Sequence, residues 1–322
     1  MLAAVAGVLV VGLVGIVVVN ALRAPQTQAS PGTYSPVPPT YSALLSIPTS
    51  STPVTTPPTT STTPPRTTPP PTATPRTTQP PAPPQPQPVY TLGDNPLFGD
   101  LGLSKVQCSW PAYQPDLAAQ KAHFTAVFAC LGKAWAPVMA ARNLPFTPPK
   151  LVVFDRPITE QAPCRERVVQ PDEPNFACGD TIYVPARYLP DVEHILPQSF
   201  DVFLEIAAHE YGHYVQNLSG VAAAAADQRS AAGANSPAGL LVSRRLELQA
   251  QCFSGMFFAA VLGPQDFHDA KVDAKLRGDF EGTGRRPDHG TPERSGAWFS
   301  QGGERNKTFE CNTWRVPPEQ VE

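Results

Sequence analysis

The feature that most limits what this chain can fold into is a proline-rich stretch close to its N-terminus. Of the 41 prolines in 322 residues, 21 lie between Pro25 and Pro88, where two arginines are the only charged side chains. Proline mixed with threonine, serine and glutamine offers too little apolar surface to offset the entropy lost on ordering. We therefore predict a disordered Pro/Thr/Ser-rich linker at residues 23–92 and a folded domain at residues 93–322.

A different kind of segment precedes the linker. Leu2 to Val19 is an uninterrupted run of 18 apolar residues. That length approaches the minimum for a membrane-spanning helix and exceeds the core of most signal peptides. We predict a transmembrane helix at residues 1–22 that acts as a signal anchor, with a cleaved signal peptide as the alternative. Arg23 follows the run and no basic residue precedes it, which by itself favours a cytoplasmic domain.

The six cysteines favour the opposite side of the membrane. All of them lie in the predicted domain, and none forms a C-x-x-C pair. An even number at wide spacing is typical of disulfides, which persist outside the reducing cytosol. Proximity favours the pairs Cys108–Cys130, Cys164–Cys178 and Cys252–Cys311, with six buried free thiols as the alternative. We therefore predict a single-pass protein of the cell membrane whose domain is extracellular.

The charge of the domain argues against nucleic acid as a partner. All 27 acidic residues lie at Asp94 or beyond, against 21 of the 24 lysines and arginines. Binding to phosphates requires clustered positive charge, which an acidic domain does not favour. We expect no nucleic acid partner.

Apolar spacing in the domain predicts an α+β fold. Helical spacing, with Gly220 as a stop and Ser236 before Pro237 as a start, predicts three helices, the first interrupted or kinked near Pro137. Two short β-branched runs predict strands. The expected helices span residues 116–141, 200–218 and 236–262, and the expected strands span residues 150–155 and 181–184.

The second of these helices carries the pattern H-E-x-x-H at His209, Glu210 and His213. Residues four apart lie on one helical face, so both imidazoles can bind the same metal ion. Zinc lowers the pKa of bound water towards neutrality, and the intervening glutamate is suited to accept the proton of that water. The pattern predicts a Zn2+ site at His209 and His213 with Glu210 as general base. Two surface histidines without a metal are the alternative.

The third zinc ligand is not part of this pattern. A catalytic zinc site normally has three protein ligands and one open position. The metzincin motif has a further histidine six residues after the second one, but this chain has Ser219 there. The remaining candidates are Glu205, one turn before His209, and Glu247, which lies 34 residues after His213 on a following helix. We favour Glu247.

Further segments give the chain a resemblance to a known family. In order, they are ACGDTIY at residues 177–183, VQN after H-E-x-G-H, LELQA with Cys252 and Gly255, HGT at residues 289–291, and WF at residues 298–299. Over roughly residues 95–315 the chain resembles the neutral zinc metallopeptidase family of bacterial membrane proteins, which includes the YpfJ-like proteins. The resemblance implies a zincin-like fold, zinc-dependent hydrolysis of a peptide or protein substrate, and Glu247 as the third ligand.

The chain departs from the usual pattern of that family at two positions. It has Tyr214 where members commonly carry histidine, and Gln251 where they commonly carry aspartate. An aspartate one turn after Glu247 would be expected to orient a zinc-binding histidine. The amide oxygen of Gln251 can accept the same hydrogen bond but adds no negative charge, which predicts weaker metal binding or activity.

His289 is a further candidate for the site, in the loop D-H-G-T. It could stabilise the oxyanion of a tetrahedral intermediate. A histidine that holds the loop by hydrogen bonds is an equal alternative.

Three functions are compatible with these patterns. The first is an active zinc peptidase on the outer side of the membrane. The second is a catalytically weak or inactive zinc-binding envelope protein that acts as a partner-binding module. The third is a structural envelope protein whose main feature is its long stalk.

Overall fold

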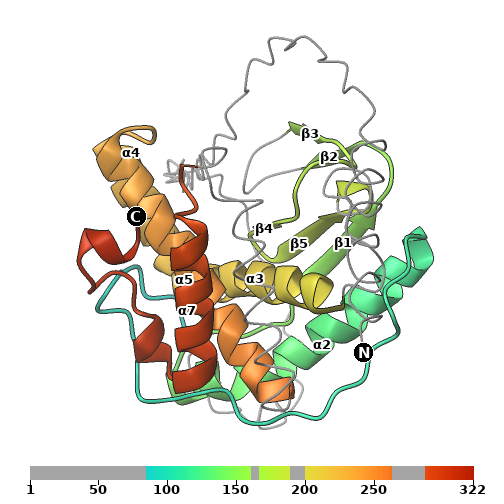
Figure 1. Cartoon of the computed structure of the whole chain (residues 1–322), viewed down its shortest axis with the longest axis horizontal. Coiled ribbons are helices and arrows are strands. Elements are labelled where there is room, and N and C mark those ends of the chain that lie inside the picture. The colour runs from blue at the N-terminus through green and yellow to red at the C-terminus, as the bar shows by residue number, and fades with distance from the viewer. Residues whose placement is uncertain (1–84, 161–166, 189–199, 263–286) are drawn as a thin grey trace, which may run out of the picture. The chain divides into compact units, whose positions relative to one another are not determined.

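The computed structural model of the chain describes residues 85–160, 167–188, 200–262 and 287–322 (Figure 1). These residues form a mixed helix-and-sheet domain, as predicted. Its helices are α2 (Leu117–Ala141), α3 (Phe200–Ser219), α4 (Val221–Ala232), α5 (Pro237–Val261) and α7 (Pro292–Arg305), followed by the short 3-10 helices η2 (Thr308–Cys311) and η3 (Pro318–Gln320). Its strands are β1 (Lys150–Phe154), β2 (Ile158–Glu160), β3 (Arg167–Val169), β4 (Phe176–Cys178) and β5 (Thr181–Pro185). The predicted membrane helix at residues 1–22 and most of the predicted linker lie outside the described residues.

The larger sheet has the strand order β1-β5-β4 and lies against helix α3 (Figure 1). Strand β1 is parallel to β5, and β4 forms an antiparallel hairpin with β5. The turn of that hairpin contains Gly179 at φ 57°, a left-handed conformation that glycine adopts without strain. Phe176 and Tyr183 are directly opposite in the hairpin, and their rings stack at 4.7 Å. Strands β2 and β3 form a separate antiparallel pair.

Helix α2 is part of the hydrophobic core. It begins after Asp116, whose carboxylate accepts a hydrogen bond from the Ala119 amide, and it continues through Pro137 without a break. By length and composition it is the one helix among the described residues that could cross a membrane, but half of its most apolar window is buried inside the domain. The fully buried Trp135 packs edge-on against Phe253 of α5. This burial is what a core helix requires, so α2 is weak support for a membrane span.

The ends of helices α3 and α5 match the predictions closely. Helix α3 ends before Gly220, which has φ 90°. Helix α5 begins at Pro237, and the hydroxyl of Ser236 accepts a hydrogen bond from the Gly239 amide. Both helices are therefore bounded by local signals that the sequence displays.

Helix α7 packs closely on α5 and was not predicted. A Cβ atom at Gly255 would lie 1.9 Å from the main-chain oxygen of Phe299, and one at Gly302 would lie 1.9 Å from that of Cys252. Only glycine fits at either position, so the two helices are in backbone contact. Helix α4, with its run of alanines, was also missed.

Two of the predicted disulfides are confirmed. Cys108 is bonded to Cys130, and Cys252 of α5 is bonded to Cys311 of η2. The third predicted pair, Cys164–Cys178, includes a cysteine outside the described residues and stays a prediction. The Cys252–Cys311 bond joins α5 to the segment that follows α7, on the same side of α5 as the glycine contacts.

Candidate metal centre

The candidate site lies between helices α3 and α5, which cross at very short distance. A Cβ atom at Gly212 would lie 3.0 Å from both the Cα and the main-chain oxygen of Ala250. The glycine of the H-E-Y-G-H segment therefore lets the backbone of α3 approach α5. Because Glu247 lies one turn before Ala250, this approach brings its carboxylate to the face of α3 that carries the two histidines.

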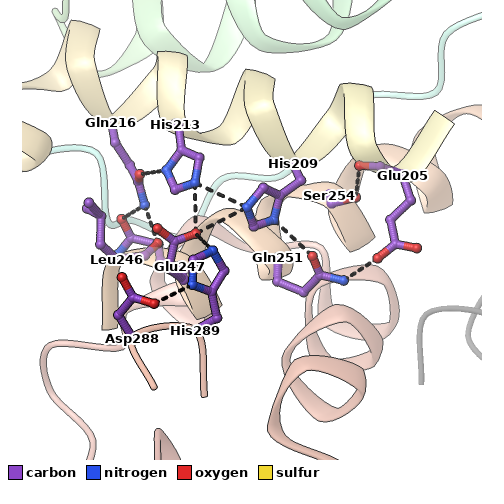
Figure 2. Close-up of polar contacts among 11 residues, drawn as sticks. Glu205, His209, His213, Gln216, Leu246, Glu247, Gln251, Ser254, Asp288 and His289 are labelled. Atoms are coloured by element: carbon purple, nitrogen blue, oxygen red, sulfur yellow. Dashed lines mark hydrogen bonds and ion pairs between the residues drawn. The ribbon is translucent and has the colours of Figure 1, made fainter. Parts of the chain in front are cut away.

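The two histidines and Glu247 form a compact triangle of donor atoms (Figure 2). His209 Nε2 is 3.3 Å from Glu247 Oε2, His213 Nε2 is 3.0 Å from the same oxygen, and the two Nε2 atoms are 3.1 Å apart. Among the described residues, this is the group of His, Cys, Asp and Glu side chains whose donor atoms all lie within 4.8 Å of one another. Their side chains are 14 to 17% exposed, so the triangle is mostly buried but remains accessible to solvent.

The triangle has the dimensions of one face of a zinc tetrahedron. Donors that bind one zinc ion at about 2.0–2.1 Å in tetrahedral geometry lie about 3.3–3.4 Å apart. The observed separations of 3.0 to 3.3 Å are close to that edge length. Two imidazoles and one carboxylate are also a donor set that zinc favours in catalytic sites. The residues present therefore fit a zinc ion.

Opposite charges within the triangle shift the pKa values of His213 and Glu247 in opposite directions. Burial alone would lower the pKa of His213, but the Glu247 carboxylate, its hydrogen bond and the charge of Glu210 outweigh burial and raise it to about 9. Burial would likewise raise the pKa of Glu247, yet the charges of His213 and His289 hold it well below its usual range. The negative charge of Glu247 thus favours positive charge at the centre of the triangle, where metal binding and protonation of His213 would compete.

Each histidine is oriented by a glutamine through its other ring nitrogen. His209 Nδ1 is 3.0 Å from Gln251 Oε1, and His213 Nδ1 is 2.8 Å from Gln216 Oε1. An amide oxygen only accepts hydrogen bonds, so both Nδ1 atoms carry the proton and both Nε2 atoms face the centre of the triangle. Gln216 is itself fixed by donation to the main-chain oxygen of Leu246. The substitution of glutamine for aspartate at residue 251 therefore preserves the hydrogen bond to His209.

The other two predicted acidic residues occupy different places. Glu205 is buried, and its carboxylate accepts a hydrogen bond from Gln251 rather than facing the triangle. It is therefore not one of the grouped donors. Glu210 is also buried, and it lies close enough to His213 for its negative charge to raise the pKa of that ring.

His289 lies at the rim of the triangle. Its Nε2 is 3.6 Å from Glu247 Oε2, and its Nδ1 is 2.9 Å from Asp288 Oδ1 (Figure 2). Burial would raise the pKa of Asp288, but the hydrogen bond and charge of His289 outweigh it and lower the pKa. An ionised Asp288 only accepts, so it directs Nδ1–H towards itself and turns Nε2 towards the site.

Helix α5 fixes the loop that carries His289. The guanidinium of Arg244 donates to the main-chain oxygen of Pro287 at 2.8 Å. Gly290 has φ 81°, and its Cα packs against Leu248, where a Cβ atom would lie 3.1 Å from a methyl carbon. Arg244 and Leu248 flank Glu247 along α5, so the same stretch of helix sets both the third donor and the histidine beside it.

Comparison with known proteins places this geometry in a family. A family model described as "Putative neutral zinc metallopeptidase" matches residues 104–314, a range that contains all five predicted site residues. The chain belongs to this family. It is 28% identical over 214 residues to "Uncharacterized protein YpfJ" of Escherichia coli K12, covering 61% of this chain and 72% of YpfJ. It is 33% identical over 132 residues to "Uncharacterized protein Rv2575" of Mycobacterium tuberculosis H37Rv, covering 34% of this chain and 43% of that relative. No solved structure matches the chain.

Three residues that shape this candidate metal site were not predicted from the sequence. Asp288 directly precedes His289, and the Asp-His dipeptide was a usable signal. Gln216 follows His213 by three residues on α3, a spacing that brings side chains together on a helix. Arg244 had no local signal, because its contact with Pro287 joins residues 43 positions apart.

Proposed function

We propose that this chain is a zinc-dependent peptidase in which His209, His213 and Glu247 bind the metal. The observation that carries the proposal is the triangle of donor atoms, whose edges of 3.0 to 3.3 Å suit one tetrahedral zinc ion. Membership of the zinc metallopeptidase family supports the identity of the metal and the class of reaction. The fold is proposed to be zincin-like, with both histidines on one helix and the third ligand on the next.

A zinc ion held by these three side chains would supply a Lewis acid able to lower the pKa of water and polarise a peptide carbonyl. Glu210 is proposed as the general base, which accepts a proton from the attacking water and then delivers it to the leaving amine. It is suited to that role because it is buried beside His213 and is not one of the three grouped donors.

His289 is proposed to stabilise the oxyanion that develops on the substrate carbonyl. Its Nε2 lies at the edge of the donor triangle, 3.6 Å from Glu247, and a protonated ring can donate from this atom while Nδ1 donates to Asp288. The short distance to Glu247 favours this role over that of a histidine that only holds the loop.

The proposed setting is the outer side of the cell membrane. Two disulfides favour an oxidising compartment. In this proposal residues 1–22 anchor the chain as a transmembrane helix, residues 23–92 form a spacer, and residues 93–322 act on a peptide or protein substrate.

The experiment that tests this function compares the full chain with its Glu210→Gln variant. Glutamine keeps the size of the side chain but removes its basicity, so zinc content should stay unchanged. Hydrolysis of an unstructured protein substrate should fall about 10²- to 10⁴-fold. Loss of zinc would contradict the ligand assignment. Full activity of the variant, or zinc binding by the wild type without any hydrolysis, would favour a partner-binding module instead.

A further inference from the structure

A buried carboxylate lies one hydrogen bond beyond the metal triangle. His209 Nδ1 is 3.0 Å from Gln251 Oε1, and Gln251 Nε2 is 2.5 Å from Glu205 Oε1 (Figure 2). Glu205 and Gln251 are 7% and 6% exposed. The three side chains therefore form a continuous hydrogen-bonded chain that crosses from α3 to α5 and back to α3.

The donor and acceptor roles in this series of hydrogen bonds follow from Glu205, the residue furthest from the triangle. Gln251 Nε2 donates to Glu205 Oε1, so the NH2 group of Gln251 faces Glu205. That choice turns the amide oxygen towards His209, and the oxygen in turn requires a proton on Nδ1. His209 is then left with its Nε2 lone pair directed at the donor triangle, which is the form of imidazole that binds a metal.

A neutral residue in place of Glu205 would remove this constraint. A glutamine amide can rotate by 180° and exchange its oxygen and nitrogen with little change in shape. The NH2 group would then face His209 Nδ1 and favour the tautomer that carries its proton on Nε2, where it competes with the metal. Glu205 also polarises the amide, because hydrogen bonds in a chain strengthen one another and bonds to a charged acceptor are stronger than neutral ones.

The second histidine offers a comparison within the same site. His213 is oriented by Gln216, whose NH2 group donates to two neutral acceptors, the main-chain oxygen of Leu246 and Oε1 of Gln249. The described contacts of Gln216 thus fix the amide without a carboxylate.

We propose that Glu205 is a positioning residue that acts through Gln251 to fix the tautomer and orientation of His209 for metal binding. Glu205 does not contact the metal in this account. Its carboxylate supplies, one residue further away, the negative charge that Gln251 itself lacks. This inference rests on the proposed zinc site.

The test uses the full chain and its Glu205→Gln variant, with zinc affinity measured by competition with a chromogenic chelator. Glu205→Gln should weaken zinc binding about 10- to 100-fold. The rescue variant Glu205→Gln/Gln251→Glu exchanges two side chains of equal length, so a carboxylate at residue 251 can accept directly from His209. It should recover most of the affinity.

The matched control is Ser254→Ala. The Ser254 hydroxyl donates to the main-chain oxygen of Glu205 at 3.3 Å, so the variant removes a buried bond between the same two helices without touching the carboxylate. It should bind zinc as the wild type does.

A spectroscopic measurement separates positioning from a general loss of structure. In the cobalt-loaded protein, the Nδ1 protons of both ligand histidines should give separate shifted NMR signals that exchange slowly with water. Glu205→Gln should accelerate exchange of the His209 signal and leave that of His213 unchanged.

Wild-type affinity in Glu205→Gln, or no recovery in the rescue variant, would overturn the inference. If Glu205→Gln does not fold, the zinc affinity of the rescue variant and the two Nδ1 NMR signals of the wild type serve as the test. A wild-type spectrum with a single slowly exchanging Nδ1 signal would then contradict the inference. A wild-type chain that binds neither zinc nor cobalt would overturn the proposed function as well. Wild-type binding with an unchanged variant would overturn only the role of Glu205.

Discussion

Helix α5 packs against α3 on one side and against α7 on another, and the two contacts differ in what fills them. Against α3, the close approach at Gly212 is surrounded by the polar side chains of the metal site. Against α7, Gly255 and Gly302 meet backbone carbonyls directly, and the rings of Phe258 and Phe299 pack edge-on at 5.1 Å. Packing sets the distance between the helices in both places, and at the α3 contact hydrogen bonds also set the orientation of side chains.

We expect a substitution at the α7 contact to have the largest effect on the free energy of unfolding. Gly255→Ala would place a methyl group 1.9 Å from the Phe299 oxygen, and a backbone atom cannot rotate away. Even after the better helix propensity of alanine, the free energy of unfolding should fall by about 3 kcal/mol. Chemical denaturation of the full chain measures this loss, and an unchanged midpoint would show that the helices are not in backbone contact.

The α7 side of α5 also contributes to the proposed site, because the loop that carries His289 leads into α7. His289→Ala should lower hydrolysis about 10- to 10³-fold with zinc retained, because a transition-state donor is lost and no grouped metal donor is removed. Asp288→Asn should also lower hydrolysis, by a smaller factor. Zinc analysis beside the rate assay checks both, and loss of zinc in His289→Ala would make this histidine a ligand instead.

A substitution at the α3 contact should affect zinc affinity more than stability. In Gly212→Ala the new methyl group lies 3.0 Å from Ala250, so the helices must separate by a few tenths of an ångström. The better helix propensity of alanine offsets much of this strain, and stability should change by about 1 kcal/mol or less. Zinc affinity should nevertheless fall by up to about 10-fold, because a shift of a few tenths of an ångström uses most of the roughly 0.5 Å within which a binding site must be held. Equal zinc affinity would mean that the helix distance does not set the donor triangle.

The smallest effect is expected away from both contacts. Asp116→Ala removes the side chain that accepts from the Ala119 amide at the start of α2. Such a change should lower the free energy of unfolding by about 1 kcal/mol and leave zinc affinity unchanged. A change in zinc affinity would contradict this and show that α2 is coupled to the site.

Local signals explain how much of this arrangement the sequence could predict. Ser236 before Pro237 and Gly220 define helix ends within a few residues, and His209 and His213 share a face because of their spacing alone. Helix α7 was missed although Thr291, Pro292 and Glu293 form a helix start, with the Thr291 hydroxyl accepting from the Arg294 amide. The local signal for this helix is therefore present in the sequence.

Other features depend on contacts between distant parts of the chain. The sequence left both Glu205 and Glu247 as candidate ligands, because the direction of each side chain is decided by how α3 and α5 pack. The hydrogen bond between Glu205 and Gln251 joins residues 46 positions apart, and no local pattern indicates it. The order of the strands in the sheet likewise depends on contacts between distant parts of the chain.

In the proposed site, His209, His213 and Glu247 together hold one zinc ion. The zinc-to-protein ratio of the full chain and of its Glu247→Ala variant, after dialysis against metal-free buffer, tests this directly. We expect one zinc per wild-type chain and a ratio close to zero in the variant, with both proteins folded. Equal ratios in the two proteins, or a wild-type chain that retains no zinc, would contradict it.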